Sequence, residues 1–270
     1  MASGARVLLV ATLTAQISAS QPAPDASRVL ADMHQALGGD ALKTIETFSV
    51  KGSEERSVGR STMHVSVEWA GMLPDRFIEV RRFPSSTITT GFNGDAALTV
   101  FEGGPGRGRS PFAAAPPKLS EATRHNMMIL AKLHFSRVTV GMFGITPVYP
   151  LDATYVSREM LDGKPVHLLE LSGPNEYVAR LCVDVSSHLP RMISWMGRPV
   201  IPGLSQFPGM GPEGSMVEHR LYFSHYEKSD GLNWPHSIKE VVAKMPMVEI
   251  RLGKFKINQR VDPTRFEPKH

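Results

Sequence analysis

The sequence is poor in cysteine and, beyond its first residues, has no long apolar run. The one cysteine, Cys182, has no partner for an internal disulfide, so a hydrophobic core must stabilise the fold without cross-links. A chain of 270 residues can bury enough surface for that. No later segment stays apolar for the roughly 20 residues that a membrane-spanning helix needs. A disulfide scaffold and a polytopic membrane protein are therefore excluded.

The common catalytic and metal-binding motifs are also missing. There is no HExxH, no GxSxG, no pair of cysteines and no phosphate-binding Gly-Lys-Ser/Thr. His219 and His225 have the same strand parity, but that length of strand spans about 20 Å, too far for one ion. Glu54 and Glu55 are adjacent and point to opposite faces of a strand. We expect no catalytic residues, no metal and no cofactor; a hydrolase with a dispersed triad is the minor alternative.

The net charge of +4 does not come with a nucleic-acid-binding signature. Lys and Arg are scattered through strand-like segments and form no basic arm. We therefore expect no nucleic-acid partner.

The N-terminus has the order of features found in secretory signal peptides. Arg6 precedes an apolar run from Val7 to Val10 that thins out to Ile17, and small residues follow at Ser18 to Ser20. The sequence predicts a cleaved signal peptide at 1–20 and a single exported domain at 21–270.

The first part of that domain predicts one helix followed by strands. Asp25 can cap a helix that ends at Gly38 and Gly39. From Phe48 the apolar period changes to 2, which is typical of strands. The predicted strands are Met63–Trp69, Arg76–Phe83, Thr87–Gly91 and Ala96–Phe101. A turn at Asn93-Gly94 separates the last two.

The second part predicts another helix and a series of hairpins. Ser120 can cap a helix that runs to about Phe135 and has a partly apolar face at Thr123, Met127 and Leu130. This helix is a candidate lid or plug. Turns at Asp162-Gly163, 186–190 and Asp230-Gly231 separate strand-like runs. The glycine- and proline-rich stretches 103–117 and 197–214 predict loops, and a parity change predicts a bulge at Gly253.

One hairpin strand shows that the predicted sheet has one apolar face. Tyr177, Ala179, Leu181 and Val183 share one face, whereas Arg180, Cys182 and Asp184 share the other. The apolar face must either be covered by the protein itself or hold a ligand.

The order of these parts resembles the LolA-like superfamily of periplasmic proteins. The resemblance rests on short motifs spread over most of the domain: 36–39 with Leu42 and Ile45, 73–77, 91–95, 161–165, 189–191, 230–236, 255–258, and Asp262-Pro263 with Phe266. One position departs from the lipoprotein carriers, which have a basic residue where this chain has Leu73 before Pro74.

The resemblance implies an α+β fold, a strongly curved antiparallel half-barrel with covering helices. It also implies a periplasmic carrier, not an enzyme, with lipid or lipoprotein acyl chains as partners. The residues expected to line the ligand cavity are Trp69, Phe77, Met127, Leu130, Leu181 and Val183. The alternative is an envelope protein-interaction or stress-sensing module, in which the protein's own helices fill the sheet and a protein partner binds outside.

Overall fold

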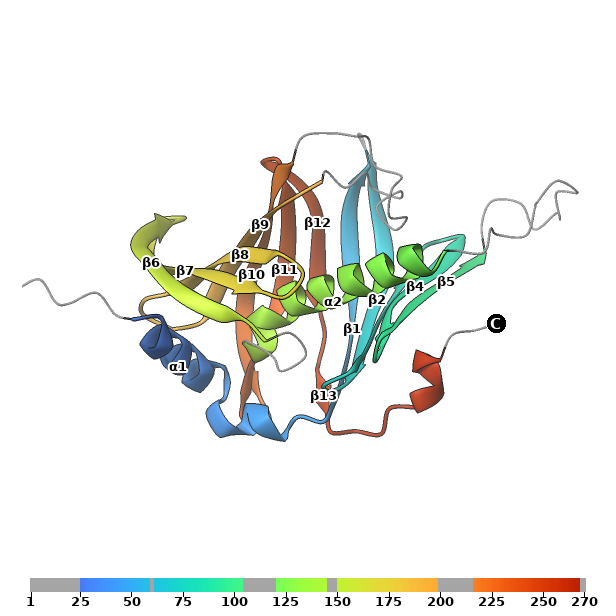
Figure 1. Cartoon of the computed structure of the whole chain (residues 1–270), viewed down its shortest axis with the longest axis horizontal. Helices are drawn as coiled ribbons and strands as arrows, with labels where there is room; N and C mark the ends of the chain where they lie inside the picture. The colour runs from blue at the N-terminus through green and yellow to red at the C-terminus, as the bar shows by residue number, and fades with distance from the viewer. Residues whose placement is uncertain (1–24, 59–60, 104–119, 145–149, 199–215, 268–270) are drawn as a thin grey trace, which may run out of the picture.

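The computed structural model describes residues 25–58, 61–103, 120–144, 150–198 and 216–267. Its strands form one open, curved antiparallel sheet of 13 strands, in the order β5-β4-β3-β2-β1-β12-β11-β10-β9-β8-β7-β6, with β13 paired to β1 (Figure 1). The helices are α1 (Ala26–Leu37), η1 (Gly39–Thr44), α2 (Glu121–Phe143) and η2 (Pro263–Phe266). The strands are β1 (Thr47–Val58), β2 (Ser61–Met72), β3 (Arg76–Arg82), β4 (Ser86–Asn93), β5 (Ala96–Gly103), β6 (Asp152–Leu161), β7 (Lys164–Gly173), β8 (Tyr177–Asp184), β9 (Pro190–Gly197), β10 (Val217–Ser229), β11 (Leu232–Val242), β12 (Met245–Leu252) and β13 (Lys256–Ile257).

The sheet consists of two meanders that meet in its middle. Strands β1 to β5 follow one another, strands β6 to β12 do the same, and β1 pairs with β12. The predicted strands and the turns at Asn93-Gly94, Asp162-Gly163 and Asp230-Gly231 are confirmed. At Gly253, between β12 and β13, the pairing with β1 shifts by one residue, from Gly52 opposite Leu252 to Ser49 opposite Lys256, as the predicted bulge requires. The two predicted loops, 103–117 and 197–214, fall almost wholly outside the described residues, as does the predicted signal peptide.

Helix α1 begins and ends as predicted. The Asp25 carboxylate accepts a hydrogen bond of 2.7 Å from the Arg28 amide. Gly38 ends the helix with a φ of 147°, which a side chain would strain. Val29, Met33 and Leu37 on one face of the helix are buried. They tie the N-terminal segment to the β6 and β11 region of the sheet.

Helix α2 begins as predicted but extends eight residues further than expected. Ser120 Oγ accepts a hydrogen bond of 3.1 Å from the Thr123 amide. The helix continues past Phe135 to Phe143 and ends at Gly144. Val138, Thr139, Val140 and Gly141 are weak helix formers, which hid the extension in the sequence. Their burial in the core supplies the stability that their propensity lacks.

We call the side of the sheet that packs against α2 the inner face. In Figure 1, α2 crosses this face from the β4–β5 end toward the other meander, and its contacts include β4, β5, β9, β10 and β11. The inner-face residues and both α-helices form one continuous core.

The outer face has two small clusters instead of a continuous core. One contains Ala70, Ile78, Val80 and Leu98 under Phe266 of η2. The other contains Val166, Leu168, Met192 and Cys182. Cys182, predicted on a polar side of its strand, is thus buried among apolar neighbours, and this burial raises the pKa of its thiol to about 11.

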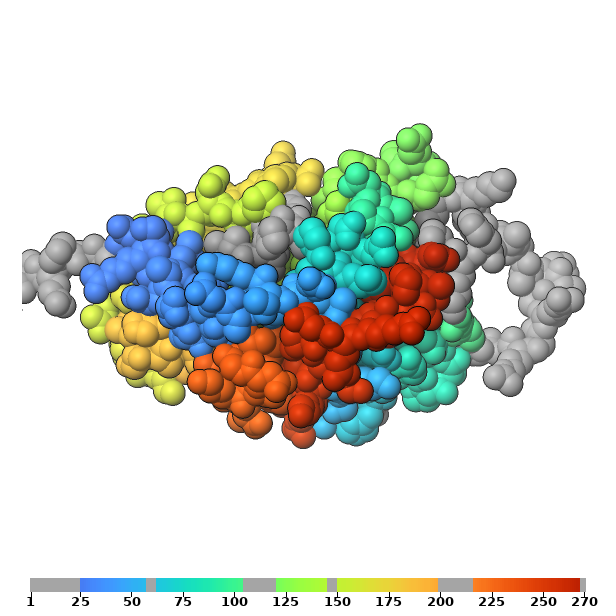
Figure 2. Space-filling view, turned by 90° about the horizontal axis from the view of Figure 1, so that it is seen from below, coloured from blue at the N-terminus to red at the C-terminus, as the bar shows by residue number. Residues whose placement is uncertain are grey.

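The C-terminal segment binds back to the start of the sheet. The Asn258 side chain accepts from the Glu46 amide at 2.8 Å and donates to the Thr44 carbonyl at 2.7 Å. Figure 2 shows the red C-terminal segment running along this side of the molecule, next to the blue N-terminal segments. Among the described residues, no helix is long and apolar enough to cross a membrane.

Candidate functional site

The apolar part of the inner face is a floor of aromatic side chains on which the C-terminal half of α2 rests. Phe135 contacts Phe77 and Phe92, with ring centroids 4.8 and 5.6 Å apart. Phe143 lies edge-on to Phe48 and Trp234, at 5.0 and 5.5 Å. Geometries of this kind add favourable quadrupole contacts to the burial of the rings.

Two further contacts hold that half of the helix close to the sheet. A Cβ at Gly141 would lie 2.4 Å from Cδ1 of Phe223, so only glycine allows this approach. The Tyr226 hydroxyl donates to the Gly141 carbonyl at 2.9 Å. Helix α2 therefore fills the inner face here as a tightly fitted plug.

Beside the aromatic floor, the same face carries a mixed-charge strip on β1, β3, β10 and β11. Its members, called the charged strip below, are Glu54, Arg56, Glu79, Arg81, His219 and Glu240. Arg81 lies 3.0 Å from Glu54 and 3.1 Å from Glu79. The Glu54 carboxylate, which is fully buried, also contacts Arg56. These groups alternate with outward-pointing residues along their strands, as strand geometry requires.

Two carboxylates of the strip, Glu79 and Glu240, have their pKa values lowered by their neighbours. Burial alone would raise the pKa of Glu79, but Arg81, His134 and the Trp69 indole N–H at 2.7 Å together hold it well below the usual range. For Glu240, burial is likewise outweighed by His219 and Arg81, and its pKa is lowered. The strip thus sets three carboxylates against two guanidinium groups, and the His219 ring lies 3.6 Å from Glu240.

Helix α2 places two basic side chains against this strip. His134 Nε2 lies 3.5 Å from Glu79 Oε2. The Arg137 guanidinium lies over the Trp195 ring, 4.3 Å from its centroid, and 5.6 Å from the Tyr177 centroid. Trp195 in turn stacks on His219 with 5.2 Å between centroids. The aromatic clamp of Trp195 and Tyr177 is therefore continuous with the charged strip.

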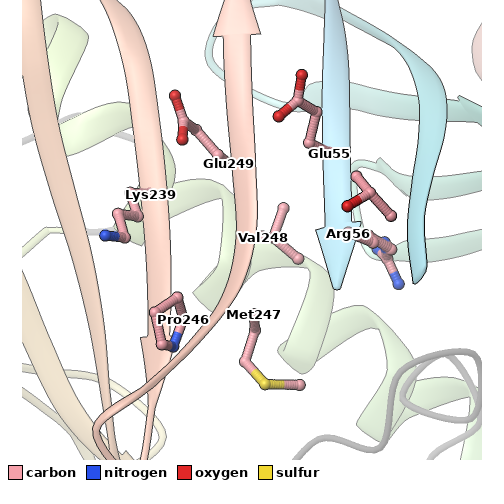
Figure 3. A pocket seen from close by; sticks show the side chains of 8 residues that line it. Glu55, Arg56, Lys239, Pro246, Met247, Val248 and Glu249 are labelled. Atoms are coloured by element: carbon pink, nitrogen blue, oxygen red, sulfur yellow. The ribbon is translucent and has the colours of Figure 1, made fainter. Parts of the chain in front are cut away.

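One pocket among the described residues borders the charged strip at Arg56. It has a volume of about 190 Å³ and is lined by Glu55, Arg56, Thr62, Lys239, Pro246, Met247, Val248 and Glu249. Figure 3 shows Glu55 and Glu249 on adjacent strands, with Lys239 nearby on the next strand. The pocket is smaller than the roughly 300 Å³ at which small-molecule sites begin, and four of its eight lining residues are charged. It does not suit an apolar ligand.

Known structures resemble this architecture at low sequence identity. A LolA superfamily protein, NE2245 from Nitrosomonas europaea, aligns with a TM-score of 0.51 and 13% identity over 90% of this chain and 97% of that one. A DUF1329 family protein from Desulfovibrio piger aligns with a TM-score of 0.50 and 12% identity, over 89% and 96%. The chain has a LolA-like fold. No protein-family model matches the chain, and no curated protein matches it.

Within the LolA-like fold, four of the six predicted cavity residues lie in the buried core of the inner face. Trp69, Phe77, Leu181 and Val183 are each at most 1% exposed. The other two are on α2: Met127 is half-buried, whereas Leu130 is 48% exposed and points away from the floor. The helix presents Met128 and Leu133 inward instead. The role of all six in binding a ligand stays a prediction.

The charged strip and the aromatic clamp were missed by sequence reasoning. Glu54, Glu79 and Glu240 stand at inward positions of strands that otherwise alternate correctly, and this parity was the available signal. Glu54 and Glu55 do point to opposite faces as expected, with Glu54 buried and Glu55 partly exposed. Among the described residues, no group of three His, Cys, Asp or Glu side chains has metal-binding geometry.

Proposed function

We propose that the protein is an exported, periplasmic binding protein that holds an amphiphile, such as a lipid or the acyl chains of a lipoprotein, on its inner face after α2 has moved away. The observation that carries this proposal is the aromatic floor. It runs across both meanders of a LolA-like sheet, and α2 is the helix that crosses it from one meander to the other. A single helix makes its backbone hydrogen bonds internally, so it can move off the sheet without breaking them. A second sheet could not move away as easily.

The energetics set what the ligand must be. Moving α2 exposes Phe135, Val138, Val140, Met142 and Phe143, at about 1.5–3 kcal/mol for each side chain, or on the order of 10 kcal/mol together. At about 25 cal/mol per Å², a ligand must bury about 400 Å² of apolar surface to offset this cost. A lipid with two or more acyl chains has that surface, so the proposal favours multi-chain ligands over single-chain ones.

A polar detail of the floor also suits a lipid ester. Trp234 is 1% exposed and stacks on Phe255, 4.4 Å between centroids. Its Nε1 has no hydrogen-bond acceptor among the described residues. A buried donor without an acceptor costs about 1–3 kcal/mol. An ester carbonyl brought in by the ligand would accept this hydrogen bond.

The test is mass spectrometry of organic extracts from the mature protein, purified without detergent from the periplasm of an exporting host. The proposal predicts a defined lipid near one equivalent per protein. Leu181→Asp, which places a charge in the floor, is expected to abolish loading, and the exposed Lys228→Ala is the matched control. Equal lipid in both folded variants would contradict the assignment of this face.

The second candidate function is an envelope protein-interaction module. It is favoured by the packing of the inner face, because the buried side chains of α2 are part of one continuous core with the sheet. In that case the plug is permanent and a partner binds outside. A stoichiometric protein partner recovered from envelope extracts, together with lipid-free folded protein, would establish it in place of the carrier.

A further inference from the structure

The charged strip lies where the polar end of an amphiphile would be placed if its chains took the position of α2. The aromatic floor contacts Phe135 and Phe143, and the strip contacts His134 on the same helix. The helix therefore resembles a bound amphiphile, with apolar side chains on the floor and basic side chains on the strip. The kind of group that α2 places against the strip indicates the kind of ligand group that the strip would bind.

The charges of the sheet itself favour a cation. Without α2, the strip has three carboxylates, those of Glu54, Glu79 and Glu240, against two guanidinium groups, those of Arg56 and Arg81, and one imidazole, His219. With α2 in place, His134 lies 3.5 Å from Glu79, and the Arg137 guanidinium adds a positive charge over Trp195 at the end of the strip. An anionic group in the same position would face these carboxylates in a poorly hydrated site, which is strongly unfavourable.

Two further observations point to a cationic donor. Glu54 is fully buried, and both of its oxygens already lie against guanidinium groups, Oε1 against Arg56 and Oε2 3.0 Å from Arg81 Nε. A buried carboxylate of this kind is stabilised by charged N–H donors, as its present partners show. The faces of Trp195 and Tyr177 already hold the guanidinium of Arg137. Aromatic faces of this kind bind ammonium and guanidinium groups.

We propose that the amphiphile bound on the inner face carries a cationic group, which replaces His134 and Arg137 against the charged strip and the Trp195–Tyr177 clamp. This inference rests on the proposed function, since it requires α2 to leave. The cation is either a lipid headgroup or a basic residue next to the acyl chains of a lipidated peptide. Both present an N–H or quaternary ammonium group beside apolar chains.

The experiment is competitive extraction from one kind of vesicle. Phosphatidylcholine vesicles contain equal small amounts of three dioleoyl lipids that differ only in headgroup: trimethylammonium-propane, glycerol and phosphatidic acid. The protein is separated from the vesicles and its lipid is quantified by mass spectrometry. We expect the cationic lipid to be enriched about tenfold over the anionic one, equivalent to about 1.4 kcal/mol. The positive net charge of the protein works against this result, so nonspecific attraction cannot produce it.

Variants assign the preference to the strip and the clamp. Glu79→Gln and Trp195→Leu are each expected to reduce the enrichment severalfold without abolishing lipid uptake. Phe101→Leu, at an exposed aromatic residue on the edge strand β5, is the matched control and should leave it unchanged. A second arm uses dipalmitoylated peptides with two lysines or two serines after the acyl chains. A lysine preference larger than the trimethylammonium preference identifies the peptide as the source of the cation.

The outcomes separate the two proposals. Uptake of all three lipids in vesicle proportions, or enrichment of the anionic lipid, overturns the cation preference and leaves the carrier function standing. Uptake of no lipid by folded protein overturns both. Enrichment of the cationic lipid that survives Glu79→Gln and Trp195→Leu also overturns the assignment to this strip.

Discussion

The two halves of α2 differ in how they contact the rest of the protein. From Phe135 to Phe143 nearly every side chain is buried, whereas from Glu121 to Leu130 only Met128 is. A salt bridge of 3.0 Å from Lys132 to Asp95 marks the change between them. One continuous helix is therefore anchored in the core at its C-terminal end and accessible to solvent at its N-terminal end. The proposed movement of α2 away from the sheet requires such an accessible end.

The largest difference between the halves should appear on truncation of side chains. Phe135→Ala removes a ring packed between Phe77 and Phe92, and we expect a loss of about 3–5 kcal/mol in the free energy of unfolding. Leu130→Ala in the exposed half should change it by less than about 0.5 kcal/mol. Urea denaturation measures both. Equal losses would contradict the division of the helix.

A smaller effect is expected from a single added methyl group. Gly141→Ala places a Cβ against the Phe223 ring, and the strain should cost about 1–3 kcal/mol. Asn126→Ala, on the exposed surface of the other half, should instead stabilise the helix by a few tenths of a kcal/mol, about the difference in helix propensity. Thermal unfolding of the two variants checks the opposite signs; destabilisation by both would show that the first half is also packed.

The contact of His134 with Glu79 should make the packing of α2 sensitive to acid. Because Arg81 and His134 lower the folded-state pKa of Glu79, this carboxylate stabilises the fold above its unfolded pKa near 4.5. That contribution is lost as the pH falls through the lower folded-state pKa. Glu79→Gln should therefore flatten the acid side of the stability profile. A profile as steep as that of the unmodified protein would contradict the role of this pair.

The smallest expected effect concerns the outer face. Burial raises the pKa of the Cys182 thiol to about 11, so alkylation at pH 8 should be slow in folded protein. Departure of α2 opens the inner face only, and an added lipid should leave the alkylation rate unchanged. Acceleration by lipid would mean that the sheet itself opens.

The sequence predicted the strands and turns better than the site. The Asp-Gly and Asn-Gly turns, and the alternation of apolar and polar residues in the strands that contain Trp69 and Leu181, are local signals. The structure has turns and strands at these positions. The C-terminal half of α2 was missed because its β-branched residues and Gly141 are selected by contacts with distant strands. The charged strip was missed for a similar reason: Glu54, Glu79 and Glu240 come from three separate strands, and no local pattern shows that they meet.

The central claim is that α2 must leave the inner face before an amphiphile binds. A Cβ at position 141 would lie 2.7 Å from Cγ of Phe223, so Gly141→Cys with Phe223→Cys, in a Cys182→Ser background, places two thiols within reach of a disulfide. Lipid uptake from vesicles by this variant, oxidised and then reduced, is the most direct measurement. We predict uptake only after reduction. Equal uptake by the oxidised and reduced protein would contradict the claim.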